Sequence, residues 1–560
     1  MLEIFISPIS ARAPLPAHPG RAAASSECPF WLECDTTLTE WRGIMVKRAG
    51  GALLPTISID HAARRPIATQ LYVALRDAIL SGAVAAGTRL PASRALARDV
   101  SVSRTTVIDA FERLIADDIL IARVGAGTYV NPALAAERPN APAAGRGTAL
   151  PRRAPRLSSA MRWTVEHLVE RSRLPHALRA FATGLPALDE FPMALWSRFA
   201  ARHWRAGRAE VMGYGDAAGD LVLRQAIVAH LGANRGIACD LDQVFITGGA
   251  QEAFLRIGAL LLNPGDKVWF ENPGAIGARN SLLAAGAELV PVPVDSDGLQ
   301  VGEALRRSGR FRLAFVTPSH QQPLGHIMSL ERRLALVRSA EQAGAWIIED
   351  DYDGEFCFGR RPISTLQSVD RSGSVIYVGT FSKSLFPALR LGFMLVPPSL
   401  VGPLRTISAA FSPGVPSSVQ AIVAEFIAEG HFAAHIRRMR RIYQERHDVL
   451  CAAAKTRLAG LLAVARTDSG LHTIGILPRW LPEEAVARAL AARHVIASPI
   501  ARFSIERAAV NGLVLGFGAV RPAEIEHGVA MLGEVLEELA ATSQRGRPRA
   551  RHDPLALRNV

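Results

Sequence analysis

Strand-like and helix-like segments alternate along residues 181–540, and this alternation constrains the fold more than any other feature of the sequence. Parallel strands need crossover connections, which are usually helices. We therefore expect an α/β fold in which helices cover a mainly parallel sheet, as in large α/β enzymes. The clearest strand-like segments, each followed by a helical pattern, span 244–247, 267–271, 313–317, 346–348 and 375–378.

The net charge of the 560-residue chain is +13, and it is distributed unevenly. Residues 133–180 carry +6 and residues 543–560 carry +4, whereas residues 57–132 carry only +2. The two most basic segments hold stretches rich in Arg, Pro, Gly and Ala without apolar periodicity, a composition typical of linkers and disordered tails. We therefore expect a flexible linker over 133–180, a large domain over 181–542 and a disordered tail over 543–560.

The N-terminus and the cysteines give expectations about the cellular compartment. Residues 1–56 have no periodic apolar face, so we expect a disordered extension or a mis-assigned start, with Met45 as the alternative first residue. The chain begins with an acid where a secretory signal has basic residues, and no run approaches ~18 consecutive apolar residues. Five scattered cysteines without Cys/His clusters suit a reducing cytoplasm. We expect a cytoplasmic protein with neither a metal site nor a membrane partner.

A small helical domain is expected over residues 57–132. Leu71, Leu75 and Ile79 recur every four residues, and Ser103 is placed to cap a later helix. Three helices followed by a glycine-tipped hairpin form a winged helix-turn-helix. The predicted elements are helices at 66–80, 91–97 and 103–115, and strands at 119–123 and 128–130.

The predicted winged domain indicates DNA binding. A recognition helix enters the major groove with its N-terminus first, so Arg104, Thr105 and Thr106 are placed to meet phosphates and base edges. Arg94, on the preceding helix, is placed to reach the DNA backbone. Any one of these arginines could equally be a solvated surface charge, but the ordered set predicts binding to double-stranded operator DNA. At the wing tip, close approach to the duplex is allowed by Gly125 and Gly127.

This stretch resembles the GntR family of bacterial regulators. The family pattern Leu-Pro-Ser-x-Arg-x-Leu-Ala is matched by residues 90–97 (LPASRALA), and Val-Ser-Arg-x-Thr-Val by residues 102–107 (VSRTTV). Ala92 stands where the family usually has Ser.

Residues 378–392 (VGTFSKSLFPALRLG) carry the strongest chemical signal in the large domain. A lysine among apolar residues can have its pKa lowered and form a Schiff base with a carbonyl group. Lys383 follows a strand and is flanked by Thr380 and Ser382, with Arg390 seven positions on. These three flanking side chains are suited to binding a phosphate.

Three other motifs are ambiguous alone. The turn at residues 247–253 (TGGAQEA) joins a strand to a helix, whose N-terminus favours an anion, although such turns are often only tight connections. Asp350, in residues 347–353 (IIEDDYD), comes at the end of an apolar strand, where α/β proteins bind ligands; ordinary loop solvation or an ion site are the alternatives. Residues 214–224, which begin with Tyr214, read as a turn leading into an amphipathic helix.

Together these motifs resemble the fold-type I pyridoxal-phosphate enzymes, the aspartate aminotransferase-like group. The resemblance implies that Lys383 forms the Schiff base, that Asp350 pairs with the pyridinium nitrogen, and that Tyr352 contacts the ring hydroxyl. An acid at the ring nitrogen keeps the cofactor protonated and electron-withdrawing. The resemblance further implies that Tyr214 reaches the cofactor phosphate of a dimer partner. The residues that match the phosphate-binding positions are Gly249, Ala250, Gln251, Thr380, Ser382 and Arg390.

A winged helix followed by this domain resembles the MocR-type subgroup of GntR regulators, which form head-to-tail dimers. Sequence motifs of this subgroup are matched at residues 317–321, 349–356, 379–383 and 435–440.

Three residues depart from the aminotransferase pattern. Ala275 stands where related proteins have a Tyr that stacks on the cofactor ring, and Gln322 precedes Pro323 where aminotransferases have Asn. Val514 stands where aminotransferases have a carboxylate-binding Arg, and an isolated Val cannot replace that clamp. Arg502 is a nearby substitute.

The sequence thus predicts a bacterial transcription regulator that binds pyridoxal phosphate, with the cofactor itself or an amino compound as effector. The alternative is an active aminotransferase with an appended DNA-binding domain. The retained Lys383, Asp350 and Tyr352 favour cofactor chemistry, while Ala275 and Val514 disfavour turnover beyond a residual half-reaction. A purely structural dimerisation role does not account for the retained lysine set.

Overall fold

The computed structural model describes residues 57–135, 157–170, 178–205, 212–358, 364–411, 414–507 and 509–545. The chain forms two compact units, divided between Ala154 and Pro155. The expected N-terminal extension, the linker residues 136–156 and 171–177, and the tail beyond 545 lie outside the described residues. Among the helices of these ranges, none combines the length and apolar character needed to cross a membrane.

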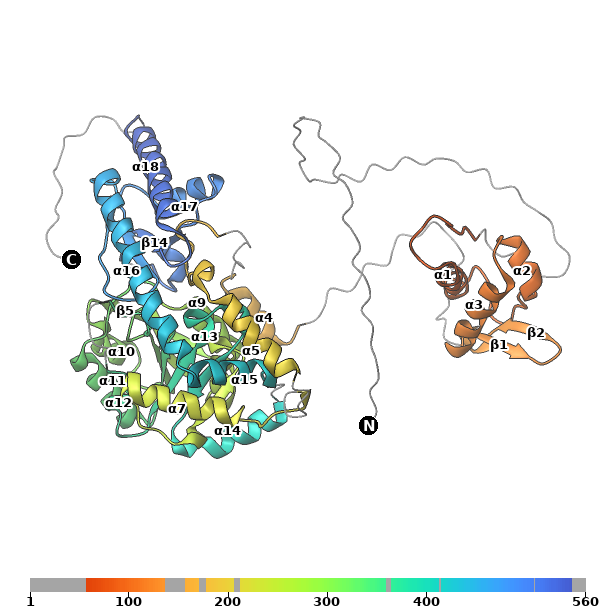
Figure 1. Cartoon of the computed structure of the whole chain (residues 1–560), viewed down its shortest axis with the longest axis horizontal. Coiled ribbons are helices and arrows are strands. Elements are labelled where there is room, and N and C mark those ends of the chain that lie inside the picture. The colour runs from red at the N-terminus through yellow and green to blue at the C-terminus, as the bar shows by residue number, and fades with distance from the viewer. Residues whose placement is uncertain are drawn as a thin grey trace, which may run out of the picture. The chain divides into compact units, whose positions relative to one another are not determined.

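The first unit has the three helices and hairpin that the sequence predicts (Figure 1). Side chains from all three helices and both strands share one apolar core, which includes Leu71, Leu75 and Leu114. Arg89 forms an isolated antiparallel β-bridge with Tyr129, so a third short stretch of chain pairs with the hairpin. The elements are α1 (Ile67–Leu80), α2 (Ser93–Asp99), α3 (Arg104–Ala116), β1 (Leu120–Arg123) and β2 (Gly127–Val130).

Ser103 caps α3 as the sequence predicts, because its Oγ accepts a hydrogen bond of 3.1 Å from the backbone N–H of Thr106. Replacing a Ser cap by Ala typically costs about 1 kcal/mol. We expect Ser103→Ala to accelerate amide hydrogen exchange in the first turns of α3 about 5-fold, as measured by mass spectrometry on the whole protein. The exposed Glu112 lies within the same helix, and Glu112→Ala is the control. Unchanged exchange in Ser103→Ala would contradict the role of the cap.

The second unit is built on an eight-stranded sheet with strand order β3-β10-β9-β8-β7-β4-β5-β6. The central pairs from β9 to β5 are parallel, whereas β10 is antiparallel to both its neighbours and β6 is antiparallel to β5. The expectation of a mainly parallel sheet is therefore confirmed. The strands are β3 (Val244–Thr247), β4 (Lys267–Asn272), β5 (Glu288–Asp295), β6 (Gly298–Leu299), β7 (Leu313–Val316), β8 (Trp346–Asp351), β9 (Val375–Thr380) and β10 (Gly392–Leu395).

Helices cover both faces of this sheet because alternate strand residues point to opposite sides. Phe315 packs with Phe254 in one core cluster, while the adjacent Ala314 and Val316 pack with Leu336 in another. The helices that surround the sheet in Figure 1 include α5 (Met193–Arg205), α7 (Leu221–Arg235), α8 (Ala250–Leu261), α9 (Ile276–Ala284), α10 (Val301–Arg307), α11 (Leu330–Ala343), α12 (Leu366–Val369), α13 (Phe381–Ser384), α14 (Pro398–Phe411) and α15 (Ser417–Ala428).

A smaller four-stranded antiparallel sheet follows, with strand order β11-β12-β14-β13. Its side chains join α16 and α18 in the largest apolar cluster. Its elements are α16 (His431–Arg457), β11 (Ala463–Val464), β12 (His472–Ile476), α17 (Glu483–Ala492), β13 (Ser498–Pro499), β14 (Gly512–Gly516) and α18 (Pro522–Arg545).

Two expected boundaries are wrong. Residues 159–167 form helix α4 (Ser159–His167) inside the expected linker 133–180. The chain just beyond this helix is docked on the large unit, because the backbone of Val169 exchanges two hydrogen bonds with the Asn280 side chain at 3.1 and 2.8 Å. The expected tail began at residue 543, yet α18 continues to Arg545.

Candidate functional site

The predicted cofactor residues converge at the carboxyl edge of the large sheet. Asp350 lies at the end of β8, Thr380 ends β9, and Lys383 lies on α13, which follows β9 directly. They line a cavity of about 250 Å³, to which the small sheet contributes one wall. Of the predicted residues, the cavity lining includes Ala250, Gln251, Asp350, Tyr352, Thr380, Ser382, Lys383 and Arg390.

Asp350 is buried, and its Oδ1 has no hydrogen-bond partner among the described residues. Burial raises the pKa of this carboxyl well above its usual range, and the neighbouring carboxylates of Asp351, Asp353 and Glu271 raise it further, while Lys383 opposes them. A buried oxygen without a partner is costly. A protonated ring nitrogen would supply the missing donor, so this observation fits pyridoxal phosphate.

The neighbouring Asp351 also has a buried Oδ1 without a hydrogen-bond partner among the described residues, but it does not line this cavity. Its Oδ2 accepts hydrogen bonds from the Arg235 guanidinium and from the Tyr377 hydroxyl. Because successive strand residues point to opposite faces, only one of the two aspartates can face the ligand. Of these two aspartates, Asp350 is the one that lines the cavity.

Lys383 lies opposite a backbone segment that the sequence did not single out. Its Nζ donates a hydrogen bond to the carbonyl oxygen of Gly184. The φ angle of Gly184 is +77°, and a Cβ there would lie 3.2 Å from the lysine Nζ. Glycine at this position therefore leaves room around the amine.

The phosphate end of the cavity combines a helix N-terminus with hydroxyl groups and a guanidinium. Gly249 precedes α8 with φ +108°, and a Cβ on it would lie 3.6 Å from the Arg390 Nη1. The Oγ of Ser382 lies 3.1 Å from the Oγ1 of Thr380. Backbone N–H groups, hydroxyls and Arg together suit a phosphate dianion.

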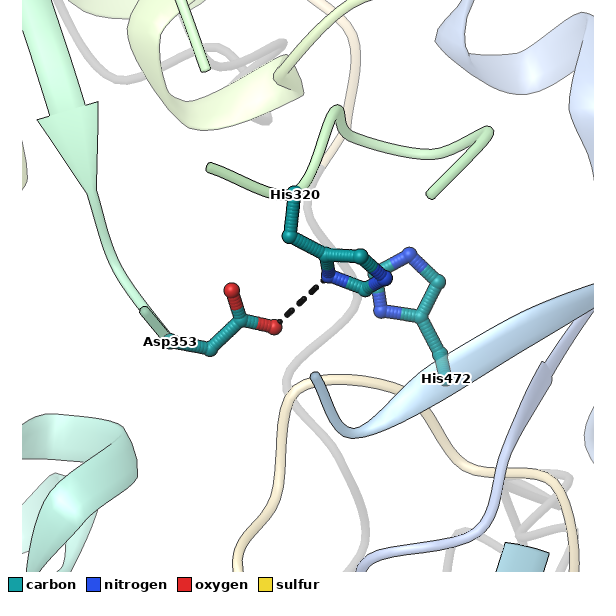
Figure 2. Close-up of side chains that lie close together, drawn as sticks. All are labelled: His320, Asp353 and His472. Atoms are coloured by element: carbon teal, nitrogen blue, oxygen red, sulfur yellow. Dashed lines mark hydrogen bonds and ion pairs between the residues drawn. The ribbon is translucent and has the colours of Figure 1, made fainter. Parts of the chain in front are cut away.

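Tyr352 is held by a buried cluster that sequence analysis missed as a site (Figure 2). Its hydroxyl donates a 2.9 Å hydrogen bond to the carbonyl oxygen of His320, whose ring Nδ1 lies 2.9 Å from the Asp353 Oδ2. His472 lies beside His320, with ring centroids 4.7 Å apart. These residues come from three distant segments, so only the fold brings them together.

The cluster of His320, Asp353 and His472 also meets the composition of a metal site, since one ligand atom from each lies within 4.8 Å of the others. Several of those atoms are already engaged by protein groups, because His320 Nδ1 pairs with Asp353 and His472 Nε2 donates to the Pro323 carbonyl oxygen at 3.1 Å. Burial and the nearby positive charge of Lys383 lower the pKa of His472. The same positive charge opposes a second cation. Hydrogen bonds occupy His320 Nδ1 and His472 Nε2, whereas His320 Nε2 is buried without a hydrogen-bond partner among the described residues.

Tyr214 is fully exposed and does not reach the cavity of its own chain. The three departures from the aminotransferase pattern all lie at the cavity, because Ala275, Gln322 and Val514 line it. Arg502 also lines it, and its Nη2 donates a 2.7 Å hydrogen bond to the carbonyl oxygen of Glu170.

In the first unit, Arg94, Arg104 and Thr105 are exposed, and Thr106 is half-buried beside its cap. Both wing glycines have positive φ angles, +73° at Gly125 and +107° at Gly127, which other residues rarely adopt.

Two basic residues beside the wing were missed by sequence analysis. Arg89 lies 3.0 Å from the position of a Cβ on Gly127, and the Arg123 guanidinium lies 4.9 Å from the Tyr129 ring centroid. These two arginines are far apart in the sequence, so no local pattern links them, and only the folded hairpin places both beside the wing.

Comparison with known proteins agrees with this two-part architecture. The family described as bacterial regulatory proteins, gntR family, matches residues 67–130, and aminotransferase class I and II matches residues 196–529. The probable rhizopine catabolism regulatory protein MocR of Rhizobium meliloti is 40% identical over 85% of this chain and 94% of its own length. The transcriptional regulator TauR of Rhodobacter capsulatus is 32% identical over 82% and 94%.

Among solved structures, the α-aminoadipate aminotransferase LysN of Thermus thermophilus covers 69% of this chain and 98% of its own. It has a TM-score of 0.62 and is 26% identical. The aminotransferase-like domain implies pyridoxal phosphate as cofactor. The expected α/β fold with a winged helix-turn-helix is confirmed, and the chain belongs to the MocR-type subgroup of the GntR family of transcription regulators, with an aminotransferase class I and II domain.

Proposed function

We propose that this regulator senses pyridoxal phosphate, or an amino compound that reacts with it, in the cavity around Lys383. The observation that carries the proposal is the partnerless oxygen of Asp350, which faces the same cavity as the lysine and the phosphate-binding groups. When bound, the cofactor supplies an aldehyde that accepts an amine. Lys383 would hold the cofactor through its aldehyde carbon, and Asp350 would accept a hydrogen bond from the ring nitrogen. Arg390, with the N-terminus of α8, holds the phosphate.

The proposed switch needs a ligand that binds two domain arrangements with different affinities. The winged-helix head, a tether and the aminotransferase-like sensing domain, which includes α4 and α18, are the proposed parts of that switch in the cytoplasm. Mapping the bound DNA with and without pyridoxal phosphate tests it. A changed footprint supports the proposal, and the same footprint in both samples contradicts it. Promoters of vitamin B6 synthesis would indicate a cofactor sensor, and promoters of amine catabolism an amino-compound sensor.

A head-to-tail homodimer is part of the proposal. Tyr214 is fully exposed and does not line the cavity of its own chain, which suits a side chain that completes the phosphate site of a second copy. Two heads on one dimer require paired half-sites in the operator. Sedimentation of the whole protein tests the dimer, and a monomer at all concentrations would exclude it.

For the DNA-binding surface, we expect Arg104→Ala to weaken operator binding by about 1–3 kcal/mol, because Arg104 opens the recognition helix and is exposed. Fluorescence anisotropy of a labelled operator measures the affinity at fixed salt. Arg113→Ala removes the same charge from the other end of α3, where Arg113 pairs with Asp109. Equal losses in both variants would show that Arg104 contributes only non-specific charge.

The alternative is an active aminotransferase with a DNA-binding domain attached. Lys383, Asp350 and Tyr352 in one cavity favour it, whereas Ala275 and Val514 leave the ring without a stacking aromatic and the substrate without a carboxylate clamp. Turnover of an amino acid with a keto acid at ordinary enzymatic rates would support this alternative.

A further inference from the structure

The small sheet and its surroundings contribute both apolar and polar side chains to the lining of the cavity. The apolar ones are Leu471, Ile496, Phe503 and Val514, and the polar ones are His472, Ser498 and Arg502. Val514 on β14 is 1% exposed and belongs to a compact apolar cluster. It pairs with Ile474 and Ser498 on the neighbouring strands, so its side chain is fixed in place. The other buried members of this cluster are Ile276, Leu324, Ile474, Ile500 and Phe503.

The described residues that line the cavity include four side chains that are or can become cations, and each of them already has another role or partner. Lys383 is the amine itself, and Arg390 lies against Gly249 at the phosphate end. Arg502 donates to the Glu170 carbonyl oxygen. Burial and the interactions with His320 and Lys383 lower the pKa of His472, which disfavours a cationic imidazole, and its Nε2 donates to the Pro323 carbonyl oxygen.

Two acidic side chains, Asp350 and Asp353, also line the cavity, and neither can serve as a cationic partner for a carboxylate. A carboxylate buried against aliphatic groups without a charged hydrogen-bond partner is strongly disfavoured. We infer that the effector is a primary amine that has no carboxylate beside its amino group. This inference rests on the proposed function, since it assumes that the amine reacts at the cofactor held by Lys383.

Matched ligand pairs test the inference on the full-length protein loaded with pyridoxal phosphate. L-Leucine and 3-methylbutylamine differ only by the carboxylate, as do L-alanine and ethylamine. The readout is the equilibrium change in the visible spectrum of the bound cofactor, which requires no turnover. We expect each amine to reach half of the maximal spectral change at a concentration about 100-fold lower than its amino acid does.

The variant Val514→Arg restores a cation to this part of the lining, and we expect it to reverse this preference. Because a buried Arg can unfold the small sheet, Arg502→Met provides a second measurement. We expect it to leave the preference unchanged. If the wild type takes both members of a pair equally well, or if Arg502→Met alone abolishes binding of the amino acid, the inference is overturned.

Failure of the inference differs visibly from failure of the proposed function. A wild-type protein that shows no visible cofactor band after reconstitution overturns the proposed function and, with it, this inference. A protein that shows the band but discriminates against simple amines overturns only the inference.

Discussion

Lys383→Ala is expected to abolish the visible absorbance that the wild-type protein gains with pyridoxal phosphate. The reason is chemical, because a covalent bond to the cofactor aldehyde needs an amine, and the Nζ of Lys383 lines the cavity that holds the phosphate-binding groups. The phosphate end, with Thr380, Ser382 and Arg390, is unchanged by this substitution. We therefore expect weaker, non-covalent binding to remain, detectable by equilibrium dialysis.

The chain offers a matched control, since Lys455 is exposed on α16. Lys455→Ala removes one lysine and leaves the cavity intact, so its spectrum should equal that of the wild type. Borohydride reduction followed by peptide mapping should place the label on Lys383. A band that persists in Lys383→Ala, or a label on another lysine, would contradict the assignment. The same variant should also lose any cofactor-dependent change in its DNA footprint.

Most of the fold follows from local patterns in the sequence. The strands at 244–247 and 313–316 and the cap at Ser103 depend on residues close together in the chain, and the structure confirms them. Helix α4 was missed because it lies in a stretch of basic, linker-like composition, and the residue that holds the following segment, Asn280, is distant in the sequence. The small sheet was not predicted either, because its strands are short and pair across long separations.

The cavity was predictable where one short motif carries several groups. Thr380, Ser382 and Lys383 come from one strand–helix junction, and Asp350 ends the neighbouring strand. Gly184 was missed because a single glycine has no distinctive signal. The cluster of His320, Asp353 and His472 was missed because each residue lies on a different segment. Tyr214 shows the limit of a single chain, since its expected site lies on a second copy.

Asp350→Asn is expected to stabilise the cofactor-free protein and to reduce the further stabilisation that the cofactor gives. In the cofactor-free protein, the Asp350 carboxyl is buried without a partner for Oδ1, and its folded pKa is raised above its unfolded value. The unfolded chain therefore releases this proton at lower pH than the folded chain does. Stability is lost as pH rises above the unfolded pKa, and the loss grows until the folded pKa is reached. Asparagine cannot ionise and removes this penalty.

We expect Asp350→Asn to stabilise the cofactor-free protein by about 1–3 kcal/mol at pH 8, the usual cost of an unsatisfied buried group, and by less at pH 5. Urea unfolding followed by tryptophan fluorescence measures this, because every described tryptophan belongs to the large unit. Asp297→Asn, at an exposed position, should change nothing.

With pyridoxal phosphate added, the wild-type carboxylate gains a positively charged partner at the ring nitrogen, whereas the asparagine variant gains only a neutral one. The rise in melting temperature on adding the cofactor should therefore be smaller in Asp350→Asn than in the wild type. A charge-assisted hydrogen bond is roughly twice as strong as a neutral one, and the protein interior enlarges the difference. A variant that is less stable without the cofactor and equally stabilised by it would show that Asp350 has a structural role, and would remove it from the cofactor site.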